Sequence, residues 1–254
     1  MPLILNGTRQ VGKTYSLKEF GNTGFSQMVY INLENNLAVI SFFEGDLNPV
    51  RIIQYLETVS NTRIIPESTL IVLDEIQSCP RALKALKVFS KEAPQYYIVA
   101  AGSLLGMAVN REKCSFPVGK VDELQMFPMD FEEFLWANQN EMLSEMIRHH
   151  FENNEPLIEA FHIQAIEIFK HYLIVGGMPG VVNEFITTQS LLTSTEIQGR
   201  ILNEYVADMV KYATVATSVK IRASFQSIPV QLAKENKKIK YQKVQSICFF
   251  QEFY

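Results

Sequence analysis

Apolar and polar positions in the first half of the chain form two alternating kinds of segment. Four short apolar runs have the length and β-branched content of buried parallel strands, at residues 2–6, 27–32, 70–74 and 96–101, and residues 122–127 are expected to form a fifth strand. Segments with apolar residues at helical spacing separate these runs, at residues 14–20, 37–43, 49–59 and 81–89. This alternation predicts an α/β domain built on a parallel sheet of five strands.

The pattern changes after Pro128. From there the chain carries helical periodicity with little glycine or proline, at residues 131–137, 143–151, 157–175, 179–187 and 191–212. The change predicts a boundary near residue 130, between the α/β domain and an all-helical domain.

Composition narrows the class of protein but identifies no chemistry. The 254 residues are 47% hydrophobic and 20% charged, which is typical of a soluble globular protein, and the net charge of −4 argues against general polyanion binding. The three cysteines, at positions 79, 114 and 248, lack metal-ligand spacing, which favours a reducing, cytoplasmic compartment. No apolar run approaches the ~20 residues of a membrane span, and Met1 leads directly into the first strand, so we expect no membrane segment and no signal peptide.

Residues 7–14 match the phosphate-binding pattern G-x-x-x-x-G-K-[ST] at each fixed position. The motif lies between a predicted strand and a predicted helix, where backbone N–H groups and the helix N-terminus favour bound phosphate. Lys13 can reach the β- and γ-phosphates, and the Thr14 hydroxyl can bind Mg²⁺. The predicted nucleotide contacts in this motif and directly after it are Gly7, Thr8, Arg9, Gln10, Val11, Gly12, Lys13, Thr14 and Tyr15.

A second motif is the apolar run of residues 70–73, which ends in Asp74 and Glu75. In open parallel sheets, ligands bind at the carboxyl ends of the strands. Asp74 is predicted to hold Mg²⁺ through water, and Glu75 to orient and deprotonate an attacking water. The simpler alternative, a strand that ends in two solvated acids, is disfavoured by the phosphate-binding motif upstream.

One predicted strand, at residues 27–32, lies between the two motif-bearing strands in the sequence. This spacing suits the P-loop class in which an extra strand also separates the two motifs in the sheet, with the strand order 5-1-4-3-2. Ser103 would then lie between the motifs and sense the γ-phosphate. The alternative is that Ser103 is a turn residue after a strand.

With these residues in view, the chain resembles the AAA+ ATPases, in a prokaryotic branch whose members carry a domain of unknown function after the ATPase. Residues 7–14 resemble the branch's GARQVGKT loop, and residues 73–77 its LDEIQ acid motif. Residues 101–103 resemble its TGS sensor, and residues 127–134 its PLSFEEF segment.

The resemblance implies a P-loop NTPase fold with ATP and Mg²⁺ as cofactors. It also implies three parts. Residues 1–130 would form the ATPase core, residues 131–215 a helical lid domain, and residues 216–254 an incomplete winged-helix segment.

Residues 172–180 predict the end of one helix and the start of the next, because two glycines release the chain and Pro179 suits the first helical position. The segment is also similar to the Gly-x-Pro motif of signalling and archaeal ATPases. That resemblance implies that Pro179 packs near the adenine of the nucleotide. Both interpretations are open.

The chain departs from the family at three places, one of which is the absence of the family's lead-in helix before the first strand. Lys120 stands where members usually carry a candidate arginine finger; either Lys120 or Arg111 would then act across a subunit interface, with less efficient hydrolysis. The end of the chain, with its apolar residues 247–254, suggests a truncated product and favours self-association. The lysines at 234, 237, 238, 240 and 243 fit a solvated helix face better than a DNA-binding face.

The sequence therefore predicts an AAA+-like ATPase that couples Mg-ATP binding and slow hydrolysis to movement of its helical domain. The predicted catalytic residues are Lys13, Glu75 and Ser103, and the predicted metal ligands are Thr14 and Asp74. Three alternatives stay open: an ATP-gated interaction switch without useful turnover, a DNA-associated ATPase of a mobile-element or defence system, and a fragment with no independent function.

Overall fold

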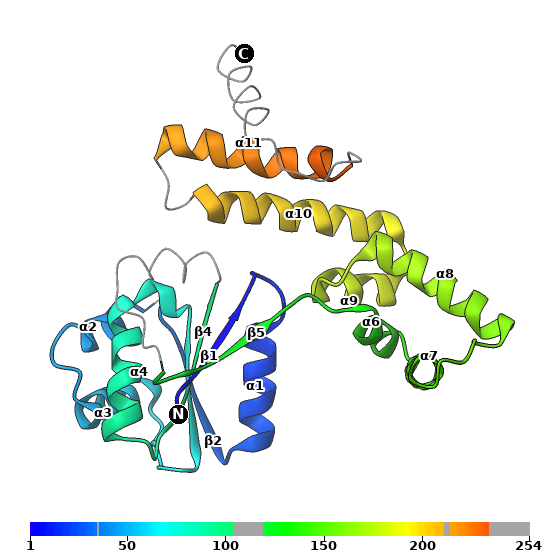
Figure 1. Cartoon of the computed structure of the whole chain (residues 1–254). Coiled ribbons are helices and arrows are strands. Elements are labelled where there is room, and N and C mark those ends of the chain that lie inside the picture. Colours follow the sequence, from blue (N-terminus) through cyan, green and yellow to red (C-terminus); the bar gives the residue numbers. More distant parts are fainter. Residues whose placement is uncertain (35, 104–118, 211–213, 234–254) are drawn as a thin grey trace. The chain divides into compact units, whose positions relative to one another are not determined.

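A parallel β-sheet of five strands organises the first half of the computed structural model, which describes residues 1–34, 36–103, 119–210 and 214–233 (Figure 1). Its strands are β1 Leu3–Gly7, β2 Gln27–Asn32, β3 Thr69–Asp74, β4 Tyr97–Ser103 and β5 Asp122–Met126. The ladders β2–β3, β3–β4, β4–β1 and β1–β5 are all parallel. The spatial order β2-β3-β4-β1-β5 confirms the predicted order 5-1-4-3-2, counted from the other edge.

Helices cover both faces of this sheet (Figure 1). Helix α1 (Lys13–Gly24) packs Leu17 against Leu70, Val72 and Val99 on one face. The other face carries the larger apolar cluster, to which helices α2, α3 and α4 and the short helix η1 contribute. Their bounds are α2 Leu37–Phe42, α3 Pro49–Ser60, η1 Ile76–Ser78 and α4 Pro80–Glu92.

Burial along the strands follows from their places in the sheet. All six residues of β3 are buried, because β3 has a strand on each side and helices over both faces. Strand β5, at an edge, has the polar sequence Asp-Glu-Leu-Gln-Met and leaves its first four residues exposed. The continuous apolar run therefore marked the strand that carries the acids at its carboxyl end.

The rest of the described chain is helical, as predicted. Its helices are α6 Phe131–Ala137, α7 Glu141–Glu152, α8 Glu159–Val175, α9 Pro179–Thr188, α10 Leu191–Val210 and α11 Val215–Leu232. Helix α6 begins with a capping box, in which the Asp130 side chain accepts from Glu133 N and the Glu133 side chain accepts from Asp130 N, both at 2.9 Å. None of the helices described is both long and apolar enough to cross a membrane.

The chain divides into two compact units, Met1–Ile186 and Thr187–Tyr254. The predicted division near residues 130 and 215 stays a prediction. Of the predicted winged-helix segment at residues 216–254, residues 216–232 belong to α11, and residues 234–254 lie outside the described residues. Arg111, Cys114, Cys248 and the lysines at 234–243 also lie outside them.

Candidate functional site

The carboxyl ends of β1, β4 and β3 bring the two sequence motifs to one edge of the sheet. Strand β4 lies between β1 and β3, and Gly7 at the end of β1 is in register with Ser103 at the end of β4. Asp74 is the last residue of β3. This is the edge where open parallel sheets bind ligands.

Glycine is required at two positions of the loop between β1 and α1. A Cβ added to Gly7 would lie 2.7 Å from the backbone oxygen of Met126, so a larger residue would displace β5. Gly12 has a φ of 94°, in the left-handed region, and is the N-cap of α1. Gln10 is also left-handed, with a φ of 63°. The chain therefore curls tightly from the strand into the helix, as phosphate-binding loops do.

The Lys13 ammonium group folds back onto this loop. Its Nζ donates hydrogen bonds to the carbonyl oxygens of Gly7, at 3.1 Å, and Thr8, at 2.6 Å. Burial lowers the pKa of Lys13 below its usual value, while the charges of Glu75 and Asp74 oppose this shift. The lysine is thus already held at the loop that is predicted to bind phosphate.

The other predicted loop contacts differ in exposure. Val11 is 1% exposed and packs against β1, so its side chain anchors the loop, and only its backbone is left to meet a ligand. Gln10 and Tyr15 are exposed, whereas Arg9 is half-buried. The Thr8 hydroxyl oxygen is buried without a hydrogen-bond partner among the described residues.

Asp74 is the point at which three elements converge. Its Oδ2 accepts hydrogen bonds from the Thr14 hydroxyl of α1, at 2.8 Å, and from the Tyr30 hydroxyl of β2, at 2.6 Å. Its Oδ1 accepts from the backbone N–H of Glu75, at 2.9 Å. The structure thus brings together the two residues predicted as metal ligands, Thr14 and Asp74, with a carboxylate that is 4% exposed.

Glu75 follows with an unusual backbone. Its φ of 54° and ψ of 44° place it in the left-handed region, which a glutamate occupies only at an energetic cost. The Gln77 side-chain amide donates a hydrogen bond to Glu75 Oε2. The predicted base is therefore held by a neighbour two residues along the chain.

Tyr30 was not among the predicted site residues. Lys18 Nζ lies 4.8 Å from the centroid of its ring, and burial, with help from the hydrogen bond to Asp74, raises the pKa of Tyr30 to about 12. Its hydroxyl consequently stays protonated, and a donor, at neutral pH. The available signal was a tyrosine in the strand that pairs with the acid-bearing strand, but the face it occupies depends on the β2–β3 register.

Ser103 is 6% exposed and forms the last residue of β4. It therefore belongs to the strand itself, between the two motif-bearing strands, and its role as a sensor stays a prediction. Lys120, in a turn before β5, is half-buried, and its predicted action across a subunit interface also stays a prediction.

The junction at residues 176–179 ends α8 and begins α9, which confirms the helix-junction interpretation. Gly176 is left-handed with a φ of 71°, and Gly177 O accepts a hydrogen bond from Met129 N at 2.7 Å. Pro179 Cγ lies 3.8 Å from the position of a Cβ built on Gly12. Pro179 is thus beside the loop that carries Lys13, and its contact with a nucleotide stays a prediction.

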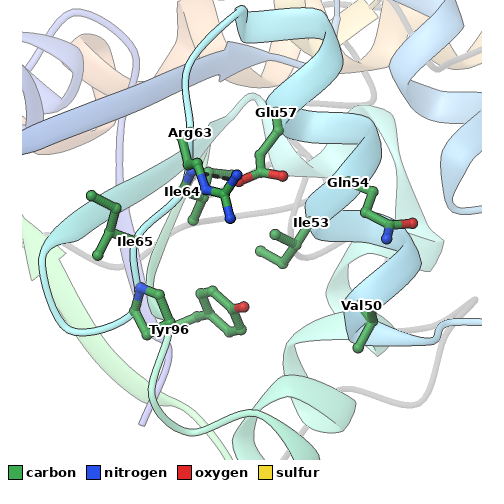
Figure 2. Close-up of a pocket in the computed structure, with 9 residues that line it drawn as sticks. Val50, Ile53, Gln54, Glu57, Arg63, Ile64, Ile65 and Tyr96 are labelled. Carbon is green, nitrogen blue, oxygen red and sulfur yellow. Dashed lines mark hydrogen bonds between the residues drawn. The ribbon is translucent and has the colours of Figure 1, made fainter.

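A cavity of about 350 Å³ lies elsewhere, between α3 and the chain before β3 and β4 (Figure 2). Figure 2 shows Ile53, Ile64 and Tyr96 around it, and Glu57 Oε1 accepts a hydrogen bond from Ile64 N at 2.8 Å. Because these residues precede the strands, the cavity belongs to the amino edge of the sheet. None of the predicted site residues lines it.

The oxygen ligands predicted for Mg²⁺ are those of Thr14 and Asp74. The described residues contain no group of three or more His, Cys, Asp or Glu that could hold a metal ion. Mg²⁺ is commonly held by one or two protein oxygens together with substrate phosphates and waters, and Thr14 and Asp74 offer that set beside a phosphate-binding loop. The residues therefore fit a magnesium–nucleotide complex.

One comparison with known protein families agrees with this geometry. A family model described as an AAA domain matches residues 1–135, just over half of the chain, and a model described as a domain of unknown function (DUF8612) matches residues 166–249. Among solved structures, the chain is similar to the Aeropyrum pernix Orc1 protein in complex with DNA, with 13% identity over 99% of this chain and 77% of that one and a TM-score of 0.34. No curated protein matches the chain.

Proposed function

The chain belongs to the AAA-domain family, a family of nucleotide-binding ATPases, and on that premise we propose that it binds ATP with Mg²⁺ and hydrolyses it slowly. One observation carries the proposal. The ends of three adjacent parallel strands bring the Lys13 loop, the Thr14–Asp74 hydrogen bond and Glu75 to the same edge of the sheet.

Each of these residues has a distinct task in the proposal. The Lys13 ammonium exchanges its carbonyl partners for β- and γ-phosphate oxygens and neutralises their charge. Thr14 and Asp74 hold the metal, which when bound neutralises charge that develops on the phosphates. Glu75 orients the attacking water and accepts its proton, and Ser103 senses the γ-phosphate.

We also propose that the nucleotide state moves the helical segment that follows the sheet. The support is local: Pro179, the first residue of α9, lies beside Gly12 in the phosphate-binding loop. A loop that tightens around phosphate would press on this proline. The junction is in turn tied to the segment before α6 through the Met129–Gly177 hydrogen bond.

A specific observation favours a second candidate, an ATP-gated interaction switch without useful turnover. The carboxylate of Glu75 is engaged by the Gln77 amide, and a glutamate that keeps this partner is poorly placed to activate water. Lys120 in place of an arginine points the same way, because lysine lacks the planar fork that stabilises the transition state. The DNA-associated alternative has no such support, because the lysines that suggested it lie outside the described residues.

Calorimetry of Mg-ATP binding, with phosphate release followed on the same samples, tests the proposal. Three variants are compared with the unmodified chain: Lys13→Ala, Glu75→Gln, and Lys84→Ala as a control at an exposed lysine of α4. We expect Lys13→Ala to weaken binding by at least ~100-fold, as removal of one partner of a close charge pair does. Glu75→Gln should bind ATP and lose phosphate release, and Lys84→Ala should behave like the unmodified chain.

Two other outcomes have clear meanings. If the unmodified chain bound Mg-ATP but released no phosphate, the interaction switch would replace the ATPase as the proposed function. Absence of binding would refute both. A rate per subunit that rises with protein concentration would support the predicted self-association, because a residue supplied across an interface acts only in an assembly.

A further inference from the structure

We propose that Tyr30 is a positioning residue of the magnesium site, whose hydroxyl fixes the Asp74 carboxylate in the orientation that the metal requires. The inference rests on the proposed function. Tyr30 lies outside both sequence motifs, on the strand next to β3. The starting point of the inference is the 2.6 Å hydrogen bond from the Tyr30 hydroxyl to Asp74 Oδ2.

The bond follows from the strand register. Tyr30 is paired with Val72, two residues before Asp74, and its ring packs with the apolar cluster that Val72 and Leu17 form on the α1 face. Since Thr14 is on α1, both hydroxyls approach Asp74 from this face. The ring length then places the Tyr30 hydroxyl at the end of β3, although its backbone lies two residues short of it.

The three donors to Asp74 are not equivalent. Glu75 N–H holds Oδ1 from within the same chain segment, and Thr14 is itself a predicted metal ligand. A threonine oxygen that binds a cation uses a lone pair and keeps its proton for the carboxylate, so the Thr14 bond depends on the metal site itself. Tyr30 is the donor to Oδ2 that takes no part in coordination. It therefore sets the carboxylate orientation before the cation arrives.

The alternative is that Tyr30 serves only to pack the α1 face. The two roles can be separated chemically, because the Tyr30→Phe change keeps the ring, its apolar contacts and the Lys18 ammonium above it, and removes only the hydroxyl. Tyr55→Phe provides a matched control. Tyr55 is on α3, on the opposite face of the sheet, where its ring lies beside Arg51.

The experiment uses the full chain and two readouts besides hydrolysis. Binding of a fluorescent ATP analogue in excess chelator measures the phosphate loop alone. Titration of Mn²⁺ into the protein–ATP complex, followed by electron paramagnetic resonance, measures the cation site. We expect Tyr30→Phe to bind the analogue like the unmodified chain and to bind Mn²⁺ ~10-fold more weakly, which is the usual consequence of removing a hydrogen-bond partner of a metal ligand. Tyr55→Phe should match the unmodified chain in both.

A double-mutant cycle separates positioning from packing. If Tyr30 acts through Asp74, Tyr30→Phe should have no further effect on Mn²⁺ affinity in an Asp74→Asn background. An effect of equal size in both backgrounds, or a matching loss of thermal stability, would show packing alone and overturn the inference. Equal Mn²⁺ affinities of Tyr30→Phe and the unmodified chain would also overturn the inference, but would leave the proposed function intact. If the unmodified chain bound no analogue and no Mn²⁺–ATP, the proposed function itself would fail, and this inference with it.

Discussion

Strand β3 and helix α8 are both rich in large apolar side chains, but they bury them to very different extents. All six residues of β3 are buried, whereas Val175 is the buried residue of α8. The side chains of α8 that remain at least one-third exposed include Phe161, Ile163, Ile166, Phe169, Leu173 and Ile174. Apolar content alone therefore does not say how an element is packed.

The number of neighbouring layers explains the difference. Strand β3 has a strand on each side and helices over both faces, whereas α8 packs along one aromatic seam with α6 and through His171 against Phe185 of α9. In that seam the ring centroids of Phe131 and Phe169 lie 5.0 Å apart, and those of Phe134 and Tyr172 lie 5.4 Å apart. We therefore expect side chains of α8 outside these contacts to contribute little to the free energy of unfolding. Four substitutions test this contrast.

The largest loss of stability is expected at the centre of the sheet. Ile71→Ala removes a side chain that is 0% exposed, in a strand enclosed on all sides. We expect it to lower the free energy of unfolding by about 2–5 kcal/mol, measured by urea denaturation. Ile71→Val, which removes a single methylene, should cost only about 0.5–1.5 kcal/mol. Similar costs for the two variants would mean that this core can relax to fill the space.

The next effect is expected at the junction between α8 and α9. A Cβ on Gly177 would lie 1.9 Å from the backbone oxygen of Met129, so Gly177→Ala forces two segments of backbone apart. We expect thermal unfolding to show a loss of about 1–3 kcal/mol, the range of an overpacked site. Gly180→Ala is the control, because nothing lies within 4 Å of its added Cβ. An unfolding free energy of Gly177→Ala equal to that of the unmodified chain would show that the junction is not in close contact with Met129.

A smaller effect is expected at the start of α6, the partner of α8. Asp130→Ala removes the acceptor of the capping box and should cost ~1 kcal/mol of unfolding free energy. Asp130→Asn keeps a capping oxygen and should stay close to the unmodified chain. The same urea titration measures both, and equal losses would indicate that the charge of Asp130 matters more than the cap.

The smallest effect is expected on the exposed side of α8. Ile163 is 55% exposed, and Ile163→Ala removes the same atoms as Ile71→Ala. We expect its free energy of unfolding to stay within ~0.5 kcal/mol of the unmodified value, as for most surface substitutions. A cost above ~2 kcal/mol would break the comparison, because it would show that this side of α8 is packed in solution.

Much of the fold could be predicted because its signals are local. Apolar runs indicated β1 to β4, and the polar strand β5 was also expected at residues 122–127. The motif spacing predicted the strand order, and the two motifs predicted the meeting of Thr14 with Asp74. Tyr30 and Gln77 could not be found in this way. Tyr30 reaches Asp74 through the register of two strands, and Gln77 reaches Glu75 through a left-handed backbone that no local preference of glutamate favours.

In the helical half of the chain, sequence patterns predicted the elements but not their packing. Helical periodicity located α6–α10, but it did not reveal how little of α8 is buried. Burial depends on which layers cover an element, and these come from distant parts of the chain. The hydrogen bond between Met129 and Gly177 is of this kind, since it joins segments that sequence patterns treat separately.

The position of β1 has a consequence for synthesis of the protein on the ribosome. Of the five strands, β1 is made before the others, but its two partners are β4 and β5, and about 90 residues separate it from the nearer one. At about 5–20 residues per second, the nascent chain carries this apolar strand unpaired for roughly 5–20 s. The segment that bears the phosphate-binding loop is therefore a natural target for chaperones, and a nucleotide can stabilise it only after β4 has left the ribosome.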